Sequence, residues 1–232
     1  MNNVNIPRAR SYHHGNLRAA LIEATLRAIA EDGPDGFTLR DVARRAGVSA
    51  AAPYRHFRDK EELLGAVAGE CAERLGELTE RAVMAAPANP LEQYRAAGIA
   101  YVQFVVAHPE HFRALNTPGI EALMPEAARR KWQHKQEEQR QALAAAQAAG
   151  VIAAMPLDDL CLAAQALMHG LGHLIVEGQL GTVSPERAME LAVAVTAVLG
   201  KGLVPRGSSA PSSSPPRTGE LTAKPARSAR RR

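Results

Sequence analysis

Apolar residues recur at helical spacing along most of the chain. After Gly15, leucine and alanine return every few positions, as at Leu17, Leu21 and Ala24, which places them on one face of a helix. A glycine and a proline at positions 33 and 34 end this segment. We find no convincing alternation of apolar and polar residues, the pattern that predicts strands. The sequence therefore predicts an all-α fold with about nine helices.

Prolines and glycines divide the chain into separate helices. The predicted helices span residues 15–32, 38–46, 49–58, 59–83, 91–107, 109–115, 121–149, 157–179 and 185–200. The side chains of Thr38, Ser49 and Asp59 can cap the second, third and fourth of these helices. From Gly202 the chain is rich in proline and serine and then basic, so we expect residues 202–232 to be disordered.

The segment GVSAAAPYRHF, residues 47–57, contains the junction between the second and third predicted helices. Two helices that meet at a steep angle across a short turn form a helix-turn-helix. Gly47 suits the reversal of the chain, and the three alanines keep the next helix thin enough for a major groove about 12 Å wide. Pro53 lies near the first turn of that helix, where its missing N–H costs least. Spacing alone leaves open a simple loop between two surface helices.

Charge is distributed unevenly along the 232 residues, whose net charge is +4. Residues 1–60 carry ten basic and six acidic side chains, and residues 201–232 carry eight and one. Residues 61–200, in contrast, carry ten basic and seventeen acidic side chains. A basic head of this kind is typical of a protein that binds a polyanion such as DNA. For the basic tail, a solvated segment and a source of non-specific DNA affinity are both open.

Two features limit the class of protein. The N-terminus lacks the apolar core of a signal peptide, and the apolar runs at 96–107 and 191–199 are shorter than the roughly 20 residues that cross a bilayer. Cys71 and Cys161 match neither a disulfide framework nor a zinc site. We therefore expect a cytoplasmic protein with no membrane contact and with reduced thiols.

The run FTLRDVARRAGVSAAAPYRHFRDKEELL, residues 37–64, resembles the N-terminal domain of the TetR family of transcriptional regulators. The opening YHHGNLR, residues 12–18, and Met168-His169-Gly170 resemble a TetR subgroup with a Trp…His-Gly motif in its C-terminal domain, with Gln165 at the usual place of the tryptophan. The resemblance implies a flexible basic arm at 1–14 and a helix-turn-helix domain at 15–60. It further implies a helical domain for effector binding and dimerisation at 61–201, before the basic tail at 202–232.

The resemblance also implies which residues contact DNA. Thr38, Tyr54, His56 and Lys60 occupy positions that usually touch phosphates, Arg44 and Arg45 lie near the DNA backbone, and Ala50, Ala51 and Arg55 lie where base edges are read. The full predicted set is Thr38, Arg44, Arg45, Ser49, Ala50, Ala51, Tyr54, Arg55, His56 and Lys60. Arg55 is the leading candidate for reading bases, together with the arm Arg8–His14, since such arms can enter the minor groove.

The large apolar residues of residues 61–201 form either a packed helical core or the lining of a cavity. The resemblance favours a cavity for an effector. The predicted ligand-binding residues are Tyr101, Phe104, Val105, Phe112, Met124, Gln165, Met168 and His169. The last two helices carry small and apolar residues, and the family pairs these helices across a two-fold axis. We therefore expect a homodimer formed through residues 157–200.

Two histidine pairs have metal-ligand spacing, His169 with His173 and His108 with His111. Pocket or interface roles are commoner for such pairs, so we predict no metal and no other cofactor. No HExxH pattern is present, and we predict no enzymatic activity.

Together these patterns predict a ligand-responsive regulator of transcription, most simply a repressor. It would bind a palindromic operator in double-stranded DNA as a dimer, and a small, largely apolar effector would release it. One alternative is a constitutive or architectural DNA-binding protein without an effector. A second, less favoured, is a small-molecule enzyme that uses the histidines of the helical body.

Overall fold

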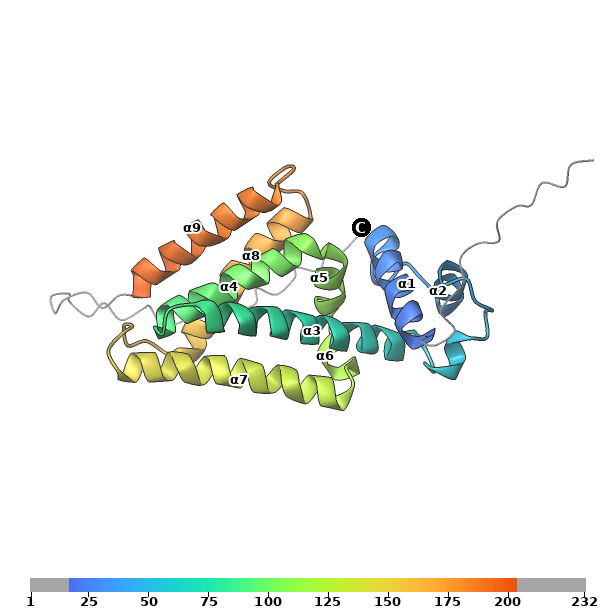
Figure 1. Ribbon diagram of the computed structural model, residues 1–232, viewed down its shortest axis with the longest axis horizontal. Coiled ribbons are helices and arrows are strands. Elements are labelled where there is room, and N and C mark those ends of the chain that lie inside the picture. The colour runs from blue at the N-terminus through green and yellow to red at the C-terminus, as the bar shows by residue number, and fades with distance from the viewer. Residues whose placement is uncertain (1–16, 204–232) are drawn as a thin grey trace, which may run out of the picture.

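The computed structural model describes residues 17–203, which form nine α-helices and one 3-10 helix and contain no strand (Figure 1). The elements are α1 (Leu17–Asp32), α2 (Leu39–Arg45), η1 (Pro53–Arg55), α3 (Lys60–Ala85), α4 (Pro90–Ala107), α5 (Pro109–Leu115), α6 (Ile120–Leu123), α7 (Glu126–Ala148), α8 (Leu157–Val176) and α9 (Pro185–Leu203). The predicted all-α fold is confirmed. The predicted arm at 1–14 and almost all of the predicted tail lie outside the described residues.

The helices form two groups joined by one long helix. In Figure 1, α1 and α2 lie at one end of the molecule, and α4 to α9 lie towards the other. We call α1, α2 and η1 the head, and α4 to α9 the body. The long helix α3 starts beside the head and runs along the body, so it connects the two groups mechanically.

Side-chain caps start α2 and α3 where the sequence predicts them. Thr38 Oγ1 accepts a hydrogen bond from the backbone N–H of Asp41 at 3.2 Å, and the Asp41 carboxylate accepts one from the N–H of Thr38 at 3.1 Å. Asp59 Oδ1 accepts from the N–H of Glu62 at 2.8 Å. These bonds satisfy N–H groups that have no partner inside the helix. Both predicted caps are confirmed.

The predicted helix over 49–58 is wrong, because only Pro53–Arg55 are helical and they form a single 3-10 turn. Pro53 has no N–H, so the bond that an α-helix would direct from it to the Ser49 carbonyl is missing. The Ser49 carbonyl instead accepts from the N–H of Ala52 at 2.9 Å, in the tighter 3-10 pattern. Ser49 is also wrong as a cap: Ala52 precedes the turn, with no side-chain hydrogen bond.

The predicted helix over 121–149 is two helices, α6 and α7, with a break at Met124 and Pro125. Met124 has extended backbone angles, φ −60° and ψ 145°. A residue that precedes proline is pushed out of the helical region by the proline ring, which explains the break. The predicted helix over 157–179 ends earlier, at Val176, ahead of Gly178, which has a positive φ of 68°.

One hydrophobic core joins the head to the body. It contains Leu21 of α1, Val42 of α2, Val67 of α3 and Ala114 of α5, each fully shielded from solvent. A second cluster packs α7 on α8 around Leu143, Ile152 and Leu160. A third packs α4, α8 and α9 around Val102, Met168, Leu171 and Ala192. The first core packs α1 directly against α3 and α5. A displacement of α5 would therefore change the packing of α1.

Candidate DNA interface and effector cavity

The turn after α2 reverses the chain at Gly47, which has a φ of 69°. Glycine adopts this left-handed conformation more easily than any other residue, because it has no side chain. The N–H of Val48 donates to the Ala43 carbonyl at 3.0 Å, which closes the end of α2. The chain then passes through Ser49 to Ala51, all of which are exposed.

Two buried residues hold the exposed tip of the head. Pro53 and Phe57 are both buried, and Phe57 is only 3% exposed. Between them, Tyr54, Arg55 and His56 are exposed, with Tyr54 at 54%. A phenol, a guanidinium and an imidazole can all donate hydrogen bonds to phosphates. The structure thus presents three DNA-compatible side chains on a short, anchored turn.

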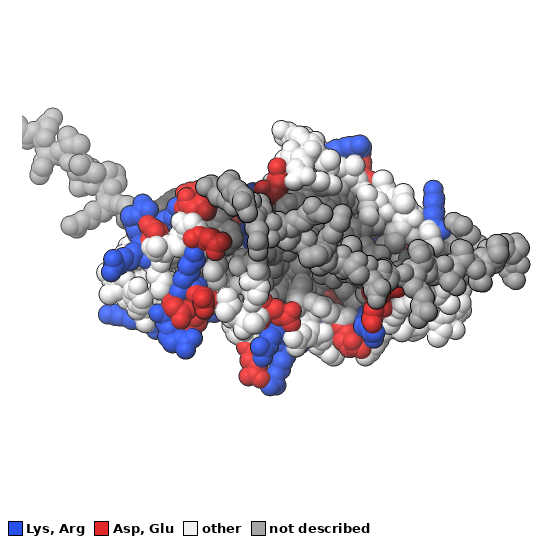
Figure 2. Space-filling view, turned by 180° about the vertical axis from the view of Figure 1, so that it is seen from behind, with Lys and Arg blue, Asp and Glu red and all other residues white. Residues whose placement is uncertain are grey.

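Most of the predicted DNA-binding residues are exposed. The exposed ones are Thr38, Arg44, Ser49, Ala50, Ala51, Tyr54, Arg55 and His56. Lysine and arginine side chains gather at this end of the molecule, with some acidic side chains among them (Figure 2). Base reading by Ala50, Ala51 and Arg55 stays a prediction.

The side chains of Arg45 and Lys60 have bonding partners within the protein. Arg45 Nη1 lies 2.5 Å from Glu31 Oε2, and Nη2 lies 2.6 Å from Asp32 Oδ2. The Glu31 carboxylate raises the pKa of Arg45, whose side chain is 17% exposed. Lys60 Nζ donates to the Asp35 carbonyl at 2.9 Å and also lies over the Phe37 ring. In this structure both cations stabilise the packing of the head.

A cavity of about 1230 Å³ lies between α3, α4, α7 and α8. Its apolar lining includes Leu75 of α3, Trp132 of α7 and Met168 of α8. Pockets of this kind, largely apolar with a few polar groups, are typical of small-molecule sites. The volume is sufficient for a ligand of drug-like size.

The predicted ligand-binding residues divide into two groups. Those that line the cavity are Tyr101, Met124, Gln165, Met168 and His169. The other three, Phe104, Val105 and Phe112, are buried and do not line it. The Phe112 ring packs 5.4 Å from the His169 ring, measured between centroids, so it supports the cavity wall from behind. The hydrophobic pattern of the sequence shows that all of these residues face inwards. It does not distinguish residues that line the cavity from residues that pack behind its wall.

Two polar groups on α4 and α8 meet in the wall of the cavity. The Tyr101 hydroxyl lies 3.4 Å from His169 Nδ1. Burial raises the pKa of Tyr101 to about 12, so its hydroxyl is a neutral donor at physiological pH. This pair offers an effector one hydroxyl and one imidazole among apolar neighbours.

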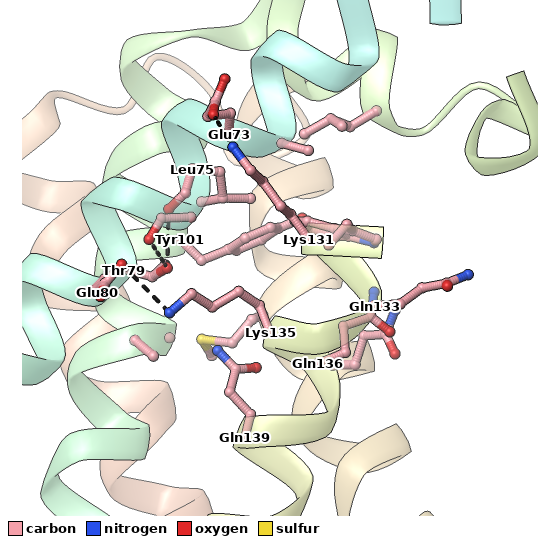
Figure 3. Close-up of a pocket in the computed structure, with 18 of the residues that line it drawn as sticks. Glu73, Leu75, Thr79, Glu80, Tyr101, Lys131, Gln133, Lys135, Gln136 and Gln139 are labelled. Atoms are coloured by element: carbon pink, nitrogen blue, oxygen red, sulfur yellow. Dashed lines mark hydrogen bonds and ion pairs between the residues drawn. The ribbon is translucent and has the colours of Figure 1, made fainter. Parts of the chain in front are cut away.

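The opposite wall, on α7, is more polar than the sequence suggests. Lys131 Nζ lies 2.8 Å from Glu73 Oε1, and Lys135 Nζ lies 3.4 Å from Glu80 Oε2. Figure 3 shows both pairs bridging α7 to α3, with Gln139 nearby on α7. Sequence reasoning missed this wall because a polar stripe on a helix indicates a solvated face. Only the packing of α7 on α3 brings the stripe to the cavity.

The cavity reaches the head through Arg18. This residue belongs to α1, and it lines the cavity together with Glu70 of α3. Arg18 Nη1 lies 2.9 Å from Glu70 Oε1. Its guanidinium carbon also lies 5.6 Å from the centroid of the Phe57 ring, which anchors the exposed tip. A single side chain therefore contacts both the cavity and the base of the candidate DNA interface.

Helices α8 and α9 expose apolar side chains. Leu162 and Leu174 of α8 are 65% and 37% exposed, and Val193 and Val198 of α9 are 40% and 72% exposed. By length and composition α8 is also apolar enough to cross a membrane, with 28% of its apolar window buried inside the protein. A single helix of this composition also occurs in the cores of proteins that bind no membrane, so the expectation of no membrane contact stays a prediction. Exposed apolar faces of this kind are typical of a surface that another chain covers.

Family comparisons agree with this division into head and body. Residues 21–67 match the model described as "Bacterial regulatory proteins, tetR family". Residues 94–198 match the model described as "Tetracyclin repressor-like, C-terminal domain". The two matches together take in α2, η1 and most of the cavity-lining helices.

A curated relative matches part of the chain. The HTH-type transcriptional regulator BetI of Burkholderia cenocepacia (strain HI2424) is 42% identical over 79 residues, which are 34% of this chain and 41% of that regulator. The chain thus matches about two fifths of the length of this curated relative.

Solved structures match over more of the chain. A protein with unknown function from Rhodococcus sp. RHA1 is 32% identical, with 84% of this chain and 100% of that chain covered and a TM-score of 0.67. A TetR family transcription regulator from Marinobacter aquaeolei VT8 shares the fold, with 20% identity, 82% and 96% coverage and a TM-score of 0.66.

Proposed function

This chain belongs to the TetR family of bacterial regulatory proteins, and from that premise we propose that it is a repressor of transcription that a small-molecule effector releases from DNA. It acts as a homodimer on a palindromic operator in double-stranded DNA. Because bacterial DNA lies in the cytoplasm, the protein acts there. The exposed tip of the head contacts the operator, and the cavity between α3, α4, α7 and α8 binds the effector. The assignment to a subgroup with a Trp…His-Gly motif stays a prediction.

The observation that carries this proposal is the position of Arg18. It lines the cavity, pairs with Glu70 of α3 and lies over the Phe57 ring behind the tip. A ligand that occupies the head end of the cavity would contact a side chain whose other neighbours belong to the candidate DNA interface. Two sites that share one structural element can be coupled in free energy.

The release mechanism follows from this connection. An effector that fills the cavity displaces α3 relative to α4 and α7, and the Arg18–Glu70 pair transmits the displacement to α1. In a dimer, this changes the separation of the two heads. A dimer holds its recognition elements roughly 34–36 Å apart to reach successive major grooves, so a small change in separation weakens binding.

The lining indicates the chemistry of the effector. Most of its body would contact apolar side chains such as Leu75, Trp132 and Met168, in keeping with the predicted apolar effector. Polar groups on the effector would be recognised by the Tyr101–His169 pair or by the glutamines of α7. No catalytic group, metal or cofactor is needed for this function.

Selection of genomic DNA fragments by the purified protein tests the proposal. We expect enrichment of a small number of fragments that share an inverted repeat, and genes next to them would suggest the effector. A compound that binds the cavity should release those fragments. If no fragment were enriched at low salt, the proposed function would be wrong.

Arg55→Ala tests the assignment of base reading. We expect discrimination between the selected site and its single-base variants to fall by about 1–3 kcal/mol at the contacted position, because a bidentate arginine contact to guanine is lost. The measurement is fluorescence anisotropy with wild-type and variant duplexes. Arg81→Ala, which removes an exposed arginine of α3 that pairs with Glu77, is the matched control. Unchanged discrimination in the Arg55 variant removes Arg55 from the base-reading residues.

A further inference from the structure

Three potential metal ligands meet where α4 ends and α5 begins. His108, Glu110 and His111 each offer one ligand atom, and these three atoms all lie within 4.8 Å of one another. We propose that this cluster binds a divalent transition-metal ion, with zinc, nickel or cobalt as the ions that suit its donors. This proposal departs from the sequence analysis, which considers only the spacing of the two histidines and predicts no metal, because the structure adds the carboxylate of Glu110.

The distances fit an ion after small side-chain rotations. His111 Nδ1 lies 2.8 Å from Glu110 Oε1, and His108 Nδ1 lies 3.9 Å from the same oxygen. Two ligand atoms about 2.0–2.1 Å from a tetrahedral ion lie roughly 3.3 Å apart. The observed separations bracket this value. To bind an ion, the His111–Glu110 hydrogen bond would open by about 0.5 Å and His108 would approach Glu110 by about 0.6 Å.

One aromatic ring packs against both imidazoles. The Phe104 ring centroid lies 5.2 Å from the His108 ring and 5.7 Å from the His111 ring. The His111 side chain is 5% exposed, so it is enclosed by its neighbours. Glu110 supplies the negative charge of the cluster, and the Arg74 guanidinium is the positive charge that acts on His111.

The donor set decides which ions suit the site. Two imidazoles and one carboxylate are borderline ligands, which favour late first-row divalent ions over magnesium and calcium. Three protein ligands leave at least one coordination position for water. An ion can enter from the solvent side, because the His108 side chain is 43% exposed.

The site lies at the start of α5, a helix that packs against α1. Ala114 of α5 belongs to the same buried core as Leu21 and Ile29 of α1. An ion bound to His108 and His111 would lock the corner between α4 and α5, and thereby fix the helix that supports α1. The site is separate from the cavity, since none of its three residues lines the cavity.

Metal titration of the full-length protein tests the proposal without any DNA. After chelator treatment and dialysis, zinc, nickel and cobalt are each titrated by calorimetry, and the thermal midpoint is recorded with and without ion. We expect saturable binding of one ion per chain by at least one of these metals, with a rise in the midpoint. Glu110→Gln and His108→Ala should each weaken that binding at least tenfold. His108 is half-exposed and Glu110→Gln keeps the side-chain shape, so both variants are expected to fold.

Two control variants locate the binding. His134→Ala removes an exposed histidine of α7 that pairs with Glu138, a similar imidazole–carboxylate pair elsewhere on the surface. The double change of His13 and His14 to alanine removes the adjacent histidines of the N-terminal segment, which lies outside the described residues. Both controls should keep the wild-type affinity. Absence of saturable binding in the wild type, or equal affinity in the wild type and in the Glu110 and His108 variants, overturns the proposal.

Discussion

Arg44 and Arg45 are neighbours in the chain, but their side chains have different surroundings. The Arg44 side chain is 73% exposed and lies 3.5 Å from a carboxylate oxygen of Asp41. Arg45 is enclosed between Glu31 and Asp32 at 2.5 and 2.6 Å. Exposed ion pairs contribute little to stability, whereas a largely enclosed guanidinium with two carboxylate partners holds α2 against the end of α1.

We predict opposite phenotypes for the two arginines. Arg44→Ala should weaken binding to all DNA sequences and should leave the thermal midpoint unchanged. The slope of the logarithm of the binding constant against the logarithm of salt concentration should fall by about 1, which corresponds to one ion fewer released on binding. Arg45→Ala should lower the thermal midpoint, because it leaves Glu31 and Asp32 without their partner. Salt titrations of DNA binding and thermal unfolding measure these effects. An Arg45 variant with the wild-type midpoint contradicts the structural role given to this residue.

The limits of sequence reasoning are visible at these same residues. The sequence predicts that Arg44, Tyr54, Arg55 and His56 are polar side chains on the outside of the head, and in the structure all four are exposed. The sequence does not show that Arg45 forms ion pairs, because its partners Glu31 and Asp32 belong to another helix and come near it only in the folded protein. DNA contact by these residues stays a prediction until binding is measured.

Among the elements, α3 carries the connection from head to body, and α6 crosses it closely at Gly65. A side-chain carbon at Gly65 would lie 1.9 Å from the carbonyl oxygen of Leu123 and 2.5 Å from its carbonyl carbon. No side chain can be accommodated at that distance without moving the backbone of α6. The absence of a side chain at Gly65 therefore allows α6 to pack beside the part of α3 that enters the head.

Two glycine-to-alanine changes in α3 test this contact. Gly65→Ala should destabilise the protein by about 1–3 kcal/mol, because α6 must move away from α3. Gly76→Ala, in the same helix, has no atom within 4 Å of the added carbon. It should be neutral or stabilise by up to about 1 kcal/mol, because alanine favours the helix. Denaturant unfolding measures both, and equal stability of the two variants would contradict the close crossing.

The helix boundaries show which signals in the sequence are reliable. The caps at Thr38 and Asp59 depend on residues close in the chain, so the sequence predicts them correctly, whereas it misses the break at Pro125. The predicted helix over 49–58 fails because three alanines favour a helix by propensity, whereas Pro53 removes one of its hydrogen bonds. The polar wall of the cavity on α7 could not be predicted, because it depends on the packing of α7 against α3.

At the scale of the whole molecule, the exposed apolar faces of α8 and α9 support a dimer. Leu162→Glu combined with Val198→Glu should convert a dimer to a monomer, because each carboxylate would be buried without a partner at the interface. DNA affinity should fall with it. Light scattering after size exclusion measures the molar mass. Met84→Glu is the control, since Met84 is 79% exposed on α3, and it should leave the mass unchanged. Retention of the dimer by the double variant places the interface elsewhere.

The central claim is that two copies of the head read duplex DNA together. Hydroxyl-radical footprinting of the purified protein on a fragment from the genomic selection tests this most directly. The account predicts two protected half-sites related by two-fold symmetry, with centres roughly 34–36 Å apart along the duplex, and loss of both when the effector is added. A single unpaired footprint, or protection that no compound able to fill the cavity relieves, would contradict the account.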